Sequence, residues 1–411
     1  MKFSIRSLKA YRSLLISLFL LMSIFSWRQI SFLTINNYLL GETINHLKRI
    51  LFYGIYYLSM VVAIITAAIL FKSIYKVPMH LWSFLTVIIS IPLLFFEAIG
   101  TDITLLYSVA SGALFGFGFP FCFAFFAEST DIQSRGRMGA TIFFLISLIF
   151  IMFGTASNNL NLQEFSLFAI IWMCAATIIL WKMQISMPST RKEIKLKSII
   201  SDRSFLLYFI SWTIYCLIDL LEAPLLQNFL NETFGADFRN SVLLLGTISA
   251  AFFILFTGFL IDLYGRKRIL LYGFIALGIA YATVSIAPSS QILWYFYSII
   301  DGIATGSFVI ILLFTIWGDL SPQGAGEKYY AIGGLPYISI VVIKEIIRPY
   351  VILIPVTAAF SFASFFLFLA VIPLMYAPET LPEKLIRRRE LEKYVEKAKK
   401  IREKYEKQRE N

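Results

Sequence analysis

Four ionisable residues lie inside long apolar runs of this chain of 411 residues, where a charge is costly. They are Arg28, Asp219, Glu222 and Asp301. Because Asp219 and Glu222 are three residues apart, a helix would place them at neighbouring positions on one face. Two carboxylates in a partly dry site cannot easily both ionise, so at least one should bind a proton more tightly than usual. The chemistry that this pattern indicates is the binding of a solute, a proton or both.

A structural role for these residues is the alternative. Arg28 and Glu222, for example, could form a buried ion pair that only holds two helices together. An ion pair from Arg28 would also keep one carboxylate ionised and make the site passive or anion-selective. The sequence leaves both readings open, and it leaves proton coupling open with them.

The residue types that enzymes use are scattered. His46 and His80 are isolated, and the three cysteines lie in apolar segments without paired spacing, which indicates neither a metal site nor a disulfide framework. No nucleophile stands beside a base, and the chain has no phosphate-binding loop. We therefore expect no catalytic residues, no metal, no cofactor and no ATP-driven pump.

Long apolar segments must position the four ionisable residues. Hydrophobic residues make up 58% of the chain and charged residues 15%, an apolar share larger than a soluble core can hide. A helix needs about 20 residues to cross a bilayer. Segments of roughly that length are expected at 13–27, 49–71, 79–98, 103–127, 138–157, 164–183, 204–228, 241–262, 268–287, 291–318, 329–348 and 351–376. The sequence therefore predicts an all-α integral membrane protein with twelve transmembrane helices.

An internal repeat predicts that these helices form two pseudo-symmetric six-helix bundles. A shift of 190 residues places Tyr107-to-Gly116 on Tyr297-to-Gly306, and two pairs of glycines coincide. In both copies the glycines are four apart, so they should let a neighbouring helix approach closely. We expect the first bundle at 1–183, a cytoplasmic linker at 184–203, the second bundle at 204–380 and a basic helical tail at 381–411.

A charged turn lies between the predicted spans 241–262 and 268–287. It reads Gly258-Phe-Leu-Ile-Asp262-Leu-Tyr-Gly265-Arg266-Lys267-Arg268. This pattern, Gly-x-x-x-Asp-x-x-Gly-Arg-Lys/Arg, resembles the loop motif of the major facilitator superfamily of transporters. The matching turn of the first half departs from the motif, because Lys72 stands where the aspartate is expected.

Other loops are similar to those of the sugar-porter branch of that superfamily. The segments are Glu128 with Arg135-Gly136-Arg137 after span four, Asp319 with Lys328 after span ten, and Pro378-Glu379-Thr380 after span twelve. The glutamine-rich sugar-binding motif of span seven is absent from this chain. The resemblance therefore covers the fold and the cytoplasmic loops but does not extend to the substrate.

The resemblance implies a cytoplasmic gate that opens and closes during alternating access. The candidate gate residues are Asp262, Gly265, Arg266, Arg268, Glu128, Arg135, Arg137 and Asp319. We expect Glu128 to pair with Arg266 or Arg268, and Asp319 to pair with Arg135 or Arg137. The alternative is that these charges only fix the membrane topology.

The resemblance also implies which spans line the central cavity, namely one, four, seven and ten. Arg28 then belongs to span one, Asp219 and Glu222 to span seven, and Asp301 to span ten. The expected function is secondary active transport of a small polar organic solute, such as a sugar or an organic acid, with or without proton coupling. One alternative is an exporter of amphipathic organic compounds, which an apolar cavity with isolated acids would favour. Another is a membrane sensor that does not transport.

The distribution of basic residues predicts the location. If both termini are cytoplasmic, 30 of the 36 Lys and Arg residues lie in cytoplasmic segments. The basic residues lie between and after the apolar runs rather than on one folded face, which argues against nucleic acid as a partner. We expect a monomeric, multi-pass protein of the cell membrane whose partners are a small molecule, lipid and, in the coupled case, protons.

Overall fold

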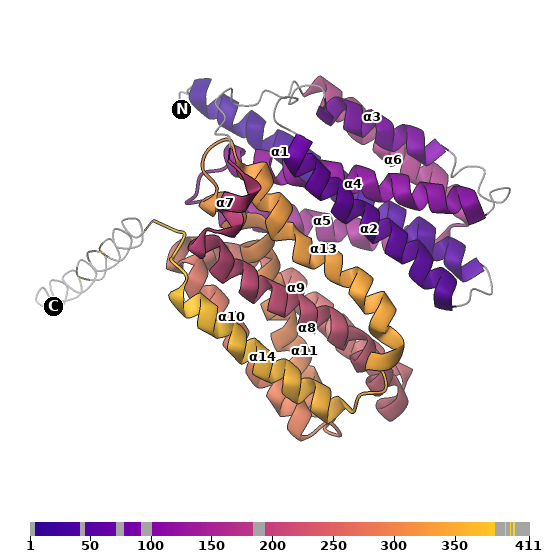
Figure 1. Ribbon diagram of the computed structural model, residues 1–411, viewed down its shortest axis with the longest axis vertical. Helices are drawn as coiled ribbons and strands as arrows, with labels where there is room; N and C mark the ends of the chain where they lie inside the picture. Colours follow the sequence, from indigo (N-terminus) through magenta and orange to yellow (C-terminus); the bar gives the residue numbers. More distant parts are fainter. Residues whose placement is uncertain are drawn as a thin grey trace, which may run out of the picture.

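The computed structural model describes residues 5–41, 46–70, 78–91, 101–183 and 194–382, together with Leu391, Val395 and Ala398. All the regular elements in these ranges are helices. Figure 1 shows them side by side in two groups, α1 to α6 and α8 to α14, with the short helix α7 between them. The predicted tail from 383 onward and residues 184–193 of the predicted linker lie outside these ranges, apart from the three single residues.

The first group follows the chain in order. Its helices are α1 (Ile5–Gly41), α2 (His46–Leu70), α3 (Pro78–Ser90), α4 (Thr101–Ser129), α5 (Arg135–Asn159) and α6 (Leu162–Lys182). The second group follows α7 (Leu196–Ile200). It consists of α8 (Arg203–Phe234), α9 (Ala236–Tyr264), α10 (Arg266–Ile286), α11 (Gln291–Phe308), the π-helix η2 (Val309–Thr315), α12 (Ile316–Leu320), α13 (Gly326–Val351) and α14 (Val356–Tyr376).

Ten helical segments within the described ranges are long and apolar enough to cross a membrane. The two remaining predicted spans, 79–98 and 329–348, correspond to α3 and α13. The apolar part of α3 is shorter than a span, Met79–Ser90, and α13 carries Glu327, Lys328, Lys344 and Arg348. The structure thus has the helices of a multi-pass membrane protein, while the count of twelve stays a prediction.

Helix α1 is much longer than the apolar segment predicted at 13–27. Its polar residues find partners inside the first group: the Asn37 amide donates to the Ser157 hydroxyl at 3.0 Å, and the Tyr53 hydroxyl donates to the Asn36 side-chain oxygen at 3.0 Å. Because these bonds satisfy its polar groups, the helix continues where apolar composition alone would end it.

The glycines of the internal repeat pack helices closely in both groups. A Cβ on Gly112 would collide with the Tyr56 carbonyl of α2, and one on Gly302 would collide with the Gly246 carbonyl of α9. Tyr56 and Gly246 are 190 positions apart, as are Gly112 and Gly302. The repeat therefore preserves the helix crossing itself: α4 lies on α2 as α11 lies on α9.

Two of the helix pairs that join the two groups are related by the repeat. Helix α5 packs on α9, and α2 packs on α13. The shift of 190 residues places α2 on α9 and α5 on α13. The two interfaces are thus equivalent under the pseudo-symmetry that the repeat predicts.

Candidate functional site

A buried carboxylate, Asp319 of α12, joins the two groups of helices. Its Oδ1 accepts a hydrogen bond from Nη1 of Arg135 at 2.5 Å, and its Oδ2 lies 2.5 Å from Nε of Arg266. The Thr380 hydroxyl also donates to Oδ2, at 3.0 Å. The side chains of Asp319 and Arg266 are fully buried. One carboxylate therefore holds a guanidinium from α5 and another from α10, without water to screen either pair.

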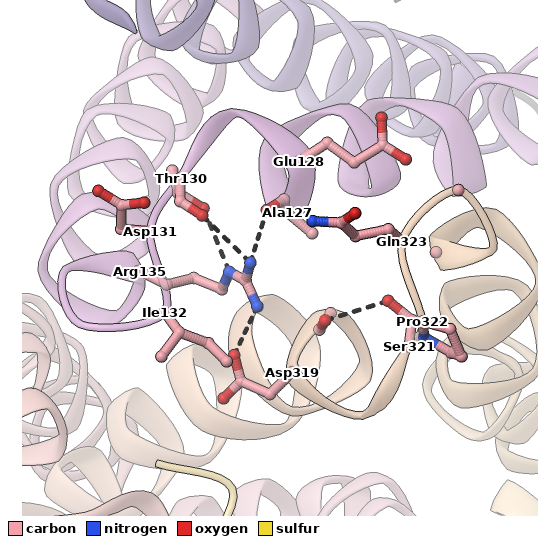
Figure 2. A pocket seen from close by; sticks show the side chains of 13 residues that line it. Ala127, Glu128, Thr130, Asp131, Ile132, Arg135, Asp319, Ser321, Pro322 and Gln323 are labelled. Atoms are coloured by element: carbon pink, nitrogen blue, oxygen red, sulfur yellow. Dashed lines mark hydrogen bonds and ion pairs between the residues drawn. The ribbon is translucent and has the colours of Figure 1, made fainter. Parts of the chain in front are cut away.

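Arg135 is held on all sides (Figure 2). Its Nη2 donates to the Ala127 carbonyl at 2.5 Å and to the Thr130 carbonyl at 3.2 Å, and its Nε donates to the Thr130 hydroxyl at 3.2 Å. These bonds fix the end of α4 to the start of α5. Because these bonds already hold the guanidinium in position, Arg135 loses little conformational entropy when it binds Asp319.

Asp262 of α9 caps a helix of the other group. Its Oδ1 accepts from the Gly136 N–H at 3.0 Å, and its Oδ2 accepts from the N–H and the Nε of Arg137, at 3.0 and 3.2 Å. Ser134, the residue before α5, makes no side-chain cap. A carboxylate is favourable at a helix N-terminus, so the α9 carboxylate supplies the cap that α5 lacks. Gly136 is needed here, because a Cβ would lie 2.6 Å from Oδ1.

Gly265 provides the tight turn between α9 and α10. Its φ of +98° lies in the left-handed region, and a Cβ there would collide with the Glu379 carboxylate. That carboxylate accepts from the N–H groups of Arg266 at 2.9 Å and Lys267 at 3.1 Å, and so caps α10. We call Arg135, Gly136, Arg137, Asp262, Gly265, Arg266, Asp319 and Glu379 the gate cluster.

One of the two predicted pairings is wrong. Glu128 does not pair with Arg266 or Arg268: its exposed side chain lines a pocket of about 400 Å³ beside the gate cluster (Figure 2), whereas Arg266 is buried. Arg268 points to the exposed surface. Arg137 binds Asp262, not Asp319, because residues two apart on a helix face different neighbours. Asp319 does pair with Arg135.

An aromatic layer lies next to the gate cluster. Phe314 of η2 contacts Phe123, Phe126 and Phe143, with ring centroids 5.0, 5.8 and 5.6 Å apart, and Phe123 stacks on Tyr330 at 5.2 Å. These rings come from both groups of helices. On this side, ion pairs and a layer of packed rings therefore join the two groups of helices.

A cavity of about 360 Å³ lies beyond this layer, between α5 and the helices α8, α9, α11 and α13. Aromatic side chains form much of its lining: Phe143, Phe150, Trp212, Tyr215 and Tyr337. Asp219 is the one lining residue, among those that the structure describes, with a carboxylate. The cavity thus combines aromatic faces with a single acid.

The predicted carboxylates lie near one another but have different partners. Glu222 is buried, and its two oxygens accept from the hydroxyls of Tyr281 at 2.5 Å and Tyr297 at 2.8 Å. Asp219 accepts from the Tyr215 hydroxyl at 3.3 Å. Asp301 interacts electrostatically with both, and its Oδ1 has no hydrogen-bond partner in the described part of the chain. Both oxygens of Glu222 thus accept hydrogen bonds from tyrosines, whereas Asp219 and Asp301 have oxygens that can accept a further hydrogen bond.

The cations of this region come from α1 and α13. The Arg28 guanidinium lies 5.7 Å from the centre of the Tyr337 ring. It does not form the ion pair with Glu222 that the sequence left open, and it interacts instead with Tyr56, Tyr57 and Tyr337. Lys344 of α13 interacts electrostatically with Asp219 and Glu222. The structure therefore brings Asp219, Glu222 and Asp301 near one another in the second group. It places Arg28 of the first group against Tyr337, which lines the cavity together with Asp219.

Two solved structures share this arrangement of helices. A crystal structure of a Major Facilitator Superfamily transporter, FucP, in the outward conformation, superimposes with a TM-score of 0.70 at 13% identity, over 90% of this chain and 98% of that chain. A single-site variant of the E. coli fucose:proton symporter FucP superimposes with a TM-score of 0.70 at 14% identity and the same coverage. The chain shares the fold of these two solved transporters. By sequence, the chain matches no family model and no curated protein.

Several residues outside the predicted lists of site residues complete the two sites. Glu379 and Thr380 complete the gate cluster, and Tyr215, Tyr281, Tyr297, Thr305, Tyr337 and Lys344 complete the cavity region. The segment Pro378-Glu379-Thr380 could have been included from the sequence, because it is similar to a loop of the sugar-porter branch. The tyrosines carried no signal, because aromatic residues are common throughout such helices.

Asp262→Asn should weaken the closed state of this gate by about 1 kcal/mol, the usual size of a lost helix cap. The effect is modest because the amide keeps one acceptor oxygen, and because the Arg137 side chain that it loses is 43% exposed. Transport should slow while solute binding stays nearly intact. Transport equal to that of the parent, at matched expression, would show that Asp262 is not part of a gate.

Proposed function

We propose that this chain is a secondary transporter that moves a small organic solute across a membrane by alternating access. One observation carries the proposal: the carboxylate of Asp319 holds arginines from both groups of helices on one side of a cavity that lies between the same groups. Breaking these pairs would let the groups separate at the gate and expose the cavity on that side. The fold shared with a fucose:proton symporter supports this function.

Two classes of solute are candidates. A small polar solute such as a sugar or an organic acid is the first, since Asp219, Tyr215 and Thr305 offer polar atoms to the cavity. An amphipathic organic compound is the second. The lining favours the amphipathic compound. Aromatic and aliphatic side chains outnumber polar ones there, and Asp219 carries the one carboxylate among the described lining residues.

We further propose that residues 1–183 and 204–380 form the two moving bundles, and that both termini lie in the cytoplasm of a cell. The positive charge of the predicted cytoplasmic segments supports this orientation. In a variant without native cysteines, a single cysteine at Ser289 should react with an impermeant reagent from outside, and one at Arg268 should not. External labelling at Arg268 would reverse the orientation.

Solute flux in proteoliposomes tests the function. The purified protein should catalyse saturable uptake of at least one solute from a panel of sugars, organic acids and amphipathic amines, measured with and without a pH gradient. Protein carrying Asp319→Asn serves as the control for leakage, because it should lose the closed gate. Binding without flux for every solute that binds would instead favour a membrane sensor with the same fold.

A further inference from the structure

We infer that the cavity takes an amphipathic organic cation and that Asp219 is its counter-ion. The inference rests on the proposed transport function, and it names the chemical class of the solute. Three features of the region carry it: the parallel aromatic rings, the balance of charges and the shortage of polar groups on the lining.

The aromatic rings form a stack along one wall of the cavity. Trp212 stacks on Tyr215 with ring centroids 5.7 Å apart and planes 19° apart, and on Tyr337 at 6.3 Å and 14°. All three rings line the cavity. Faces of tryptophan and tyrosine attract a cation through the negative charge of the π-system, more strongly where water is excluded. A flat apolar group of the same ligand can pack on these faces.

The acids of the region outnumber its cations in the described part of the chain. The acidic side is Asp219, Glu222 and Asp301, which interact with one another. The basic side is Lys344, which interacts with Asp219 and Glu222, and Arg28, which lies over Tyr337 and interacts with tyrosines. A buried carboxylate needs a cation or a proton. A positive charge brought by the solute would reduce this excess of acid.

Asp219 is the acid that a solute can reach. It lines the cavity, whereas Glu222 and Asp301 do not. Both oxygens of Glu222 are engaged by tyrosine hydroxyls, while the hydrogen bond that Asp219 receives from Tyr215 is 3.3 Å long. That tyrosine hydroxyl also lies 2.9 Å from the Thr305 hydroxyl, so it has another partner if a ligand displaces it.

The lining does not suit a sugar. A sugar has many hydroxyl groups, and each one that is buried without a hydrogen bond weakens binding. The lining offers the hydroxyls of Ser147, Thr247 and Thr305 besides Tyr215, Tyr337 and Asp219, and the indole N–H of Trp212, which has no hydrogen-bond partner among the described residues. The remaining side chains are apolar or carry a thiol. At about 360 Å³, the cavity matches a small organic molecule with one ring and one ammonium group.

Binding of benzyltrimethylammonium to the purified full-length protein tests the inference. Its charge is permanent, so protonation of the ligand cannot complicate the result. Titration calorimetry should show binding to the parent, weakened about tenfold or more in Asp219→Asn because the counter-ion is lost. The anion phenylmethanesulfonate should not bind, and neopentylbenzene, the uncharged isostere, should compete poorly. Asp237→Asn removes an exposed carboxylate of α9 and should bind like the parent.

The outcomes separate the cation site from the transport function. Equal affinity of the parent and Asp219→Asn for benzyltrimethylammonium, or no binding by either folded protein, would overturn the cation site, even if some other solute is transported. Binding that depends on Asp219, without flux of the bound cation in proteoliposomes, would leave the cation site standing and overturn the transporter. Monitoring the melting temperature of each variant excludes misfolding as the cause of lost binding.

Discussion

Asp319→Asn should open the gate and abolish transport driven by a gradient. The substitution leaves the guanidiniums of Arg135 and Arg266 buried without their carboxylate, and breaking a buried ion pair in this way costs about 3–5 kcal/mol. A shift from almost fully closed to almost fully open takes about 5.5 kcal/mol. The population of the closed state should therefore fall, so that this state becomes one of several populated states or a minor one.

Distances across the gate give a direct measurement. Spin labels at Gln133 and Gln323, which are exposed on the α4–α5 and α12–α13 loops, should move apart in Asp319→Asn relative to the parent. Asp131→Asn removes an exposed carboxylate from the same α4–α5 loop and should leave both distance and transport unchanged. Asp319→Glu keeps the charge and should recover part of the closed state. An unchanged distance distribution in a folded Asp319→Asn protein would show that another contact holds the gate.

Asp219→Asn should uncouple transport from protons. A carboxylate that lines the cavity can exchange a proton for a solute, or carry both, whereas an amide can do neither at ordinary pH. With one proton per solute, a pH difference of one unit can sustain about a tenfold solute gradient. The parent should move protons when solute is added to proteoliposomes and should build such a gradient. Asp219→Asn should do neither.

Glu222→Gln separates a coupling residue from a positioning residue. Its carboxylate orients Tyr281 and Tyr297, so the amide should slow transport while the ratio of protons to solute stays as in the parent. If the ratio collapses in Glu222→Gln and survives in Asp219→Asn, the two assignments are reversed. A parent that accumulates nothing under an imposed pH gradient would rule out proton coupling altogether.

Apolar composition predicted most of the helices because a helix that crosses a lipid bilayer must be mostly apolar over about 20 residues. The predicted spans 103–127 and 241–262 lie inside α4 and α9 with a few residues to spare at each end. Composition could not predict the length of α1, since the partners of Asn36 and Asn37 are on other helices. It also gave no sign of the π-helix η2 inside the predicted span 291–318, because backbone register depends on packing rather than on hydrophobicity.

The gate residues could be named from the sequence, but their partners could not. A short motif fixes Asp262 and Gly265 locally, and a resemblance suggests Asp319 and Arg135. Which carboxylate meets which arginine depends on the rotation of α5 against α9 and α12. That rotation directs Arg135 to Asp319 and Arg137 to Asp262, and it leaves Glu128 at the surface. Asp219 and Glu222 look alike in the sequence, and the structure distinguishes them by their neighbouring tyrosines and by the cavity, which Asp219 lines and Glu222 does not.

The gate cluster contains as many guanidiniums as carboxylates. Arg135, Arg137 and Arg266 balance Asp262, Asp319 and Glu379. A charge that crosses the membrane field gains or loses about 2.3 kcal/mol per 100 mV. The two parts of the cluster carry opposite charges, because Arg135 and Arg137 lie on α5 and the other charged members lie in the second group. Parts that separate in the plane of the membrane do not cross the field. Opening and closing of the gate should therefore be nearly indifferent to membrane voltage. Any voltage dependence of the whole cycle would then come from the charge that Asp219 and its ligand carry.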